Sequence, residues 1–191
     1  MIYQLYFYDG KIENEDFRNS LRDEAIYTYL TDSGAEEPFG EIVIEKGEHD
    51  KPYVRGNEIN GIPVYFNISH SEELWVMMIG PSEVGADIQK KRHCNFYDIS
   101  ERYFEDMEKA FVNKGGEDAF FKIWVHREAL GKLAGDGFFG EKPGLVNMMG
   151  NLNGKIDLNG RTAYIKDIEI SDEILLSYAT YDKDSEYVLR G

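Results

Sequence analysis

The chain has 191 residues, of which 42% are hydrophobic and 14% aromatic, and its formal net charge at pH 7 is -15. This composition predicts one folded domain, or two small lobes that share a core, and excludes a disordered chain. The negative charge argues against nucleic acid and anionic membrane surfaces as main partners. Cys94 is the only cysteine, so no disulfide can form within the chain.

The first residues, MIYQLYFYDG, contain no basic segment and no small-residue cleavage site, so we expect no signal peptide. No apolar run approaches the roughly 20 residues that a membrane-spanning helix needs. We therefore expect a cytoplasmic protein.

The first half of the sequence alternates strand and helix patterns. Residues 2–8 are apolar and aromatic and predict a strand, and apolar residues at i, i+4 spacing predict a helix over 15–30. Lys51-Pro52 begins an extended segment, because proline disfavours helix in the residue before it. Residues 61–69 and 74–79 predict a hairpin across a polar turn, Ser69-His70-Ser71.

The second half begins with a predicted strand at 84–89, with Asp87 and Gln89 on one face. Helices are predicted at 98–104 and 117–134, separated by Gly115-Gly116, and a glycine-containing loop at 135–150. Strands at 155–158, 164–170 and 174–181 follow, the first two joined through Asn159-Gly160, a strong hairpin signal. The sequence thus predicts an α+β fold of antiparallel strands and packed helices.

Two polar segments could bind a ligand. Hydroxyl, imidazole and backbone N–H groups in the predicted turn at 67–71 suit an anion such as phosphate, although serine and asparagine also favour turns that bind nothing. Asp87 and Gln89 offer two oxygen ligands to Mg²⁺. The alternative is an aspartate at a strand end that faces solvent.

A third segment is the predicted helix around residues 120–133. Trp124, Glu128 and Lys132 follow i, i+4, i+8 spacing and share one face, while most of the other residues are apolar. Glu128 and Lys132 are therefore candidates for charges that face a cleft. The alternative is an exposed ion pair worth about 0.2–0.5 kcal/mol.

In their order and spacing these segments resemble the Sfp-type 4′-phosphopantetheinyl transferases. The resemblance rests on Lys51-Pro52, on FNISHS at 66–71, on GADIQ at 85–89 and on WVHREALGK at 124–132. It implies two similar α+β lobes related by a pseudo-twofold axis, with coenzyme A bound between them. We place the lobes at residues 1–84 and 85–191 within one compact unit.

The resemblance also implies a reaction: a carrier-protein serine attacks the β-phosphate of coenzyme A, phosphopantetheine moves to that serine, and 3′,5′-ADP leaves. It implies Mg²⁺ as cofactor and an acyl or peptidyl carrier protein as partner, and we expect a monomer. The metal ligands would be Asp87, Gln89 and Glu128. Glu128, Lys132 and His70 would be catalytic, and coenzyme A would contact Lys51, Pro52, Ser69, His70 and Lys132.

Three features depart from the family pattern. Gln89 stands where many members have glutamate, and Asp50 stands where a glycine often precedes Lys-Pro. The family's arginine-rich N-terminal stretch has no clear counterpart, since Arg18 and Arg22 lie on one short predicted helix. These departures favour an alternative, a catalytically weak or inactive coenzyme A-binding or scaffold protein. A metal-dependent phosphoesterase would need only the same acidic residues.

Overall fold

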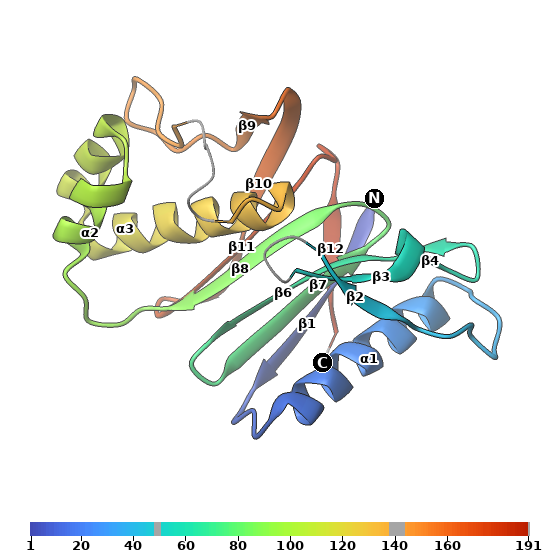
Figure 1. Ribbon diagram of the computed structural model, residues 1–191. Coiled ribbons are helices and arrows are strands. Elements are labelled where there is room, and N and C mark those ends of the chain that lie inside the picture. Colours follow the sequence, from blue (N-terminus) through green and yellow to red (C-terminus); the bar gives the residue numbers. More distant parts are fainter. Residues whose placement is uncertain (48–50, 138–143, 191) are drawn as a thin grey trace.

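The computed structural model describes residues 1–47, 51–137 and 144–190 (Figure 1). In chain order the elements are β1 (Ile2–Asp9), α1 (Glu15–Asp32), β2 (Ile44–Lys46), β3 (Pro52–Val54), β4 (Glu58–Ile59), β5 (Ile62–Pro63), β6 (Tyr65–Ser71), β7 (Leu74–Gly80), β8 (Val84–Lys90), α2 (Phe96–Tyr103), α3 (Asp106–Ala134), β9 (Lys155–Leu158), β10 (Arg161–Ser171), β11 (Ile174–Thr180) and β12 (Glu186–Arg190). A short 3₁₀ helix, Arg55–Asn57, lies between β3 and β4. The α+β class predicted from the sequence is confirmed.

The two halves of the chain build the same arrangement. The first sheet has the strand order β12-β1-β7-β6, and the second has the order β8-β11-β10-β9. In each half a strand is followed by a helix and later by a hairpin, and the last hairpin strand pairs antiparallel with the first strand. The expected pair of similar lobes is confirmed. The boundary at residue 84 stays a prediction, and β12 pairs in parallel with β1, at the other end of the sequence.

An apolar core shared by the two sheets holds the halves together. It combines residues of the first sheet with residues of the second, among them Tyr3, Leu5, Val76, Met78, Ala86, Ile88, Leu176 and Tyr178. Separate apolar clusters lie under α1 and under α3. Figure 1 shows these two helices on opposite sides of the molecule with the strands between them. This packing also places β6 of the first sheet in contact with β8 of the second.

The hairpins of both halves follow the predicted pattern. β6 pairs antiparallel with β7, and β9 with β10. Asn159 and Gly160 have φ angles of 56° and 78°, the positive values that a two-residue hairpin turn requires. Asn-Gly is thus the turn that joins β9 to β10, as expected.

The predicted polar turn at Ser69-His70-Ser71 is wrong. β6 continues to Ser71, and the chain reverses at Glu72, whose φ is 54°, and Glu73. Asn67, Ser69 and Ser71 are buried strand residues. Their side chains satisfy backbone groups of a different strand, so the local preference of these residue types for turns is overridden.

Helix α3 begins earlier than expected. It starts at Asp106 with a capping box between Glu105 and Glu108, and Gly116, with φ 66° and ψ -145°, kinks it. The glycine pair predicted as a break is therefore a kink between two helical segments. α2 lies close to its predicted range.

The sequence analysis also missed one strand, β12 (Glu186–Arg190). Asp50 and part of the predicted loop at 135–150 lie outside the described residues. Within the described ranges, no helix is both long and apolar enough to cross a membrane.

Candidate functional site

Three side chains of β6 form a ladder of hydrogen bonds to the edge of β8. The Asn67 Oδ1 atom accepts from the N–H of Ala86 at 2.9 Å, and Ser69 Oγ accepts from the N–H of Ile88 at 3.3 Å. Ser71 Oγ accepts from the N–H of Lys90 at 3.0 Å. The donors are two residues apart because alternate N–H groups of a strand point to the same edge. The other edge of β8 pairs with β11, so β6 satisfies the edge that the second sheet leaves open.

Ser69 also belongs to a triangle of polar groups with Asp87 and Lys132. Its hydroxyl lies 2.7 Å from Asp87 Oδ1 and 2.8 Å from Lys132 Nζ, and Lys132 Nζ donates to the same Asp87 oxygen at 2.7 Å. Asp87 is only 6% exposed. β6, β8 and α3 each contribute one member, so three of the four segments singled out in the sequence meet at one point.

Gly85 explains how α3 comes so close to β8. A Cβ atom at this position would lie 2.1 Å from the carbonyl oxygen of Ala129 and 2.4 Å from the backbone nitrogen of Leu133. These distances are far shorter than any real contact, so only glycine lets the helix backbone rest on the strand. The close approach brings Lys132, on the same turn, within reach of Asp87.

Lys51 connects the first half of the chain to the end of α3. Its Nζ donates to the backbone carbonyl of Lys132 at 2.5 Å, in the last turn of the helix, where a cation is favoured by the helix dipole. Burial lowers the pKa of Lys51; the Glu83 carboxylate opposes this shift and Lys132 adds to it. Beside Lys51 lies a pocket of about 190 Å³ whose lining includes Pro52, Tyr53, Phe66 and Glu83.

His70 is exposed on β6, between the buried Ser69 and Ser71. Burial of its ring lowers its pKa below the ordinary value of 6.5, the positive charges of Arg18 and Lys132 lower it further, and Asp87 opposes the shift. These electrostatic influences place Arg18, from the first turns of α1, and Lys132, from α3, on the same side of the molecule as His70. Arg18 and Lys132, from distant segments, thus both act on His70, and Lys132 also contacts Asp87.

The sequence did not assign Arg18 to the site. The side chain of Arg18 is exposed, and among the described residues it has no ion pair or hydrogen-bond partner. Arg22, four residues later, instead bonds to Asp23 and Asn19. The only available signal was that Arg18 lies on the predicted helix with a charge that no acidic neighbour at i+4 neutralises, and such a signal is weak.

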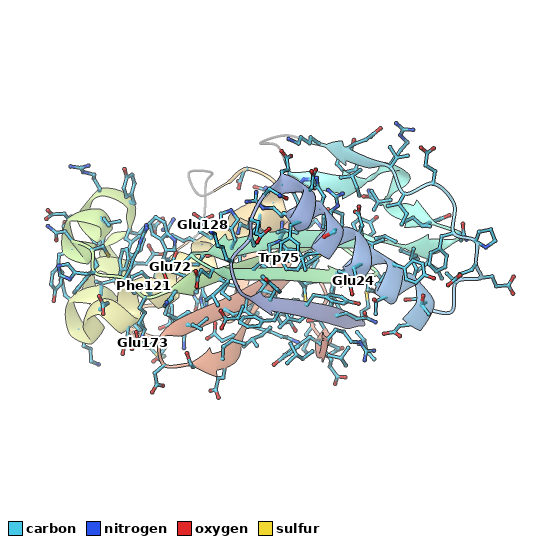
Figure 2. The ribbon with its side chains drawn as sticks, turned by 90° about the horizontal axis from the view of Figure 1, so that it is seen from below. Glu24, Glu72, Trp75, Phe121, Glu128 and Glu173 are labelled. Carbon is cyan, nitrogen blue, oxygen red and sulfur yellow. The ribbon has the colours of Figure 1, made fainter. Side chains whose placement is uncertain are left out.

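Gln89 follows Asp87 by two residues on β8, and Glu128 precedes Lys132 by four residues on α3. Gln89 Nε2 donates to Ser71 Oγ at 3.1 Å and to the carbonyl of Lys90 at 2.7 Å, so both recorded bonds use its amide nitrogen. Glu128 is partly exposed and lies one turn before Lys132 on α3, on the part of the helix that lies against the strands (Figure 2). Across the described chain, no three His, Cys, Asp or Glu side chains are grouped closely enough to hold a metal ion. The expected ligand set differs, because it combines two carboxylates with an amide.

Arg127 lies next to Glu128 in the sequence but points into the core. Its Nη2 donates to Glu108 Oε2 at 2.6 Å, and the other carboxylate oxygen of Glu108 accepts from the N–H of Leu145 at 2.9 Å. Arg127 and Glu108 are 6% and 0% exposed. This basic residue is therefore a buried anchor between the two segments of α3 and the chain after it.

A second polar cluster lies at the other side of α3. His126 Nε2 and Ser177 Oγ lie 2.6 Å and 2.7 Å from Asp167 Oδ1, and Lys122 Nζ lies 3.1 Å from Oδ2. Burial raises the pKa of Asp167, but the bonds and charges of His126, Ser177 and Lys122 outweigh it and hold this pKa well below its ordinary range. Ser177 is the cross-strand neighbour of both Asp87 and Asp167, so the two acids lie two strands apart on the face under α3.

Among known proteins, no family model matches the chain. The 4′-phosphopantetheinyl transferase gsp of Aneurinibacillus migulanus is 29% identical over 106 residues, which are 53% of this chain and 42% of that protein. The 4′-phosphopantetheinyl transferase psf-1 of Bacillus pumilus is 30% identical over 127 residues, which are 64% of this chain and 52% of that protein.

The chain thus spans about half the length of the curated relatives it matches. Both relatives carry the family name that the four motifs suggested, and the α+β arrangement agrees with it. The resemblance seen in the motifs is confirmed: the chain is similar in sequence to two proteins named 4′-phosphopantetheinyl transferases.

Proposed function

We propose that the chain transfers the 4′-phosphopantetheine group of coenzyme A to a serine of an apo carrier protein, with Mg²⁺ as cofactor, and releases 3′,5′-ADP. The observation that carries the proposal is the contact of Asp87 with Lys132 at 2.7 Å. These residues are 45 positions apart, come from two different motifs, and meet beside Ser69 of a third. Two relatives named for this activity support the same reading.

The basic groups suit a substrate with a pyrophosphate. Phosphoryl transfer is catalysed mainly by positioning the reacting groups and by neutralising charge on phosphate oxygens. Lys132 contacts Asp87, and the charges of Lys132 and Arg18 both act on His70, in a chain whose net charge is -15. Charge-assisted hydrogen bonds from these groups would hold the phosphates against the repulsion of the acidic surface. The pocket beside Lys51 and Pro52 is the place for the nucleotide end of coenzyme A.

The expected metal ligands fit a hard divalent cation. Asp87 and Glu128 offer carboxylate oxygens, and Gln89, whose recorded bonds engage its nitrogen, retains its carbonyl oxygen for a cation. Mg²⁺ accepts a small number of protein oxygens together with water and substrate phosphates. Bound there, the ion would supply positive charge to the pyrophosphate oxygens.

Glu128 is the candidate base. The carrier serine forms a bond from its oxygen to the β-phosphorus, the bond from that phosphorus to the bridging oxygen breaks, and the electron pair leaves with 3′,5′-ADP. The serine proton must move to a carboxylate on the reacting side. Glu128 is partly exposed, while Asp87 is buried, so Glu128 is the carboxylate more accessible to the carrier serine.

The alternative is a catalytically weak or inactive coenzyme A-binding or scaffold protein of the same fold. One observation favours it: Gln89 is neutral, so the metal site has one negative charge fewer than a site with glutamate there. Such a protein would bind coenzyme A and modify no carrier.

One experiment separates these functions. The full chain is incubated with coenzyme A, Mg²⁺ and a panel of apo carrier proteins, and each carrier is weighed by mass spectrometry. A phosphopantetheine mass increase that disappears in Glu128→Gln and persists in Glu173→Gln supports the transferase. Figure 2 shows Glu173 at the β10–β11 turn, well apart from Glu128, so it is a charge-matched control. Coenzyme A binding without modification supports the scaffold, and coenzyme A hydrolysis without a carrier supports a phosphoesterase.

A further inference from the structure

The ammonium group of Lys132 occupies the oxygen that a metal ion would need. Asp87 Oδ1 accepts hydrogen bonds from Lys132 Nζ and from Ser69 Oγ, each at 2.7 Å. The carboxylate side chain is 8% exposed and that of Lys132 is 24% exposed. Solvent and salt screen this pair much less than a surface ion pair. Asp87 is therefore already neutralised by a residue of the chain itself.

A divalent cation and this ammonium group would repel each other if both were bound to the same oxygen of Asp87. Mg²⁺ approaches its oxygen ligands to about 2.0–2.1 Å. An ammonium group hydrogen-bonded to the same oxygen would then face the ion across a short distance, and like charges repel strongly where the surroundings are poor in water. Tight metal binding at Asp87 requires Lys132 to move.

The ammonium group of Lys132 can move from Asp87 to another acceptor. Its Nζ ends a long flexible side chain, and its other partner, Ser69, is a neutral hydroxyl. Phosphate oxygens are stronger acceptors for an ammonium group than a hydroxyl. Arg18 and His70 lie on the same side, so a phosphate attracted by these groups would arrive within reach of Lys132.

We propose that Lys132 acts as a gate on the metal site: it holds Asp87 until a substrate phosphate draws it away, so that the divalent cation binds after, or together with, the phosphate. This inference rests on the proposed metal-dependent transfer. It adds an order of binding that is encoded in one lysine, which positions a phosphate in one state and excludes the cation in the other.

The test is a calorimetric titration of the full chain with Mn²⁺ in the absence of coenzyme A. Lys132→Met and Lys132→Gln, each verified as folded by circular dichroism, should bind Mn²⁺ at least tenfold more tightly than the unmodified chain. Lys122→Met removes the same charge from the same helix, but Lys122 pairs with Asp167 instead of Asp87. This control should bind Mn²⁺ like the unmodified chain.

Equal Mn²⁺ affinity in the Lys132 variants and the unmodified chain would overturn the gate, as would an equal gain in Lys122→Met. Adding Asp87→Asn to Lys132→Met should remove the gain, and its persistence would also contradict the proposal. Transfer is not measured in these titrations. A chain that shows the gain but modifies no carrier keeps the gate and loses the transferase assignment, and a transferase without the gain loses only the gate.

Discussion

Asn67 accepts a hydrogen bond from the backbone N–H of Ala86 at 2.9 Å, although the two residues belong to different sheets. Ser69 and Ser71 repeat this contact at the next two alternate positions of β8. The polar motif of β6 is therefore first a structural device. It replaces a missing strand at the edge of the second sheet, and thereby fixes the strand that carries Asp87.

The first prediction concerns this ladder. Asn67→Ala leaves the N–H of Ala86 buried without its partner, because both Asn67 and Ala86 are almost inaccessible to solvent. Leaving a buried donor unsatisfied costs about 1–3 kcal/mol, so urea denaturation should show a loss of stability of this size. Asn113→Ala, on an exposed position of α3, is the control and should change stability by less than about 0.5 kcal/mol. An Asn67→Ala variant as stable as the control would contradict the role of the ladder.

The same ladder shows where sequence reasoning succeeded and where it could not. Apolar runs and periodicity identified β1, α1, β7 and β8, and Asn159-Gly160 identified the β9–β10 hairpin. It misread Ser69-His70-Ser71 as a turn because the two serines there bond to a strand of another sheet. The local sequence pattern does not indicate a hydrogen-bond partner that lies on a distant strand. β12 was missed for a similar reason: its five residues form a strand only by pairing with β1.

The site was more predictable than its surroundings. The resemblance carried by the four motifs implied one site that includes Asp87, Glu128 and Lys132. Asp87 and Lys132 meet at 2.7 Å, and the roles of these residues stay predictions. Arg18 was not assigned, because its proximity to His70 depends on how α1 packs against the first sheet. Arg127, in the helix motif, is held by Glu108 in the core, since α3 begins eleven residues before its predicted start and supplies an acid that the shorter helix lacks.

A second prediction concerns Gly85. Gly85→Ala places a methyl group against the backbone of Ala129 and Leu133, so α3 must shift away from β8. Overpacking of this kind costs about 1–3 kcal/mol or more, and the shift separates Lys132 from Asp87. We expect a lower urea midpoint together with a loss of carrier modification. Gly154→Ala is the matched control, because nothing lies within 4 Å of a Cβ atom there. If both variants keep the stability and activity of the unmodified chain, close packing of α3 is not what positions the site.

A third prediction separates the two arginines of α1. Arg18 is exposed beside His70, whereas Arg22 is already bonded to Asp23 and Asn19. If the basic cluster binds the phosphates of coenzyme A, Arg18→Ala should weaken coenzyme A binding about tenfold, which corresponds to about 1.4 kcal/mol. Arg22→Ala should leave the affinity unchanged. Isothermal titration with coenzyme A measures both, and equal effects of the two substitutions would remove Arg18 from the site.

The last prediction concerns the titration of His70. Burial and the charges of Arg18 and Lys132 lower its pKa below 6.5, so the folded chain binds this proton less readily than the unfolded chain does. Between the lowered pKa and 6.5 the unfolded state carries more protons, and stability therefore falls as the pH decreases through this window. Histidine NMR should place the pKa of His70 below 6.5 and show that Arg18→Ala raises it, while Arg22→Ala does not. In His70→Gln, the decrease in stability between pH 8 and pH 5.5 should be smaller than in the unmodified chain. A His70 pKa at or above 6.5, or one that does not change in Arg18→Ala, would show that the basic side chains do not act on one another. The proposed phosphate site would then lose its electrostatic basis.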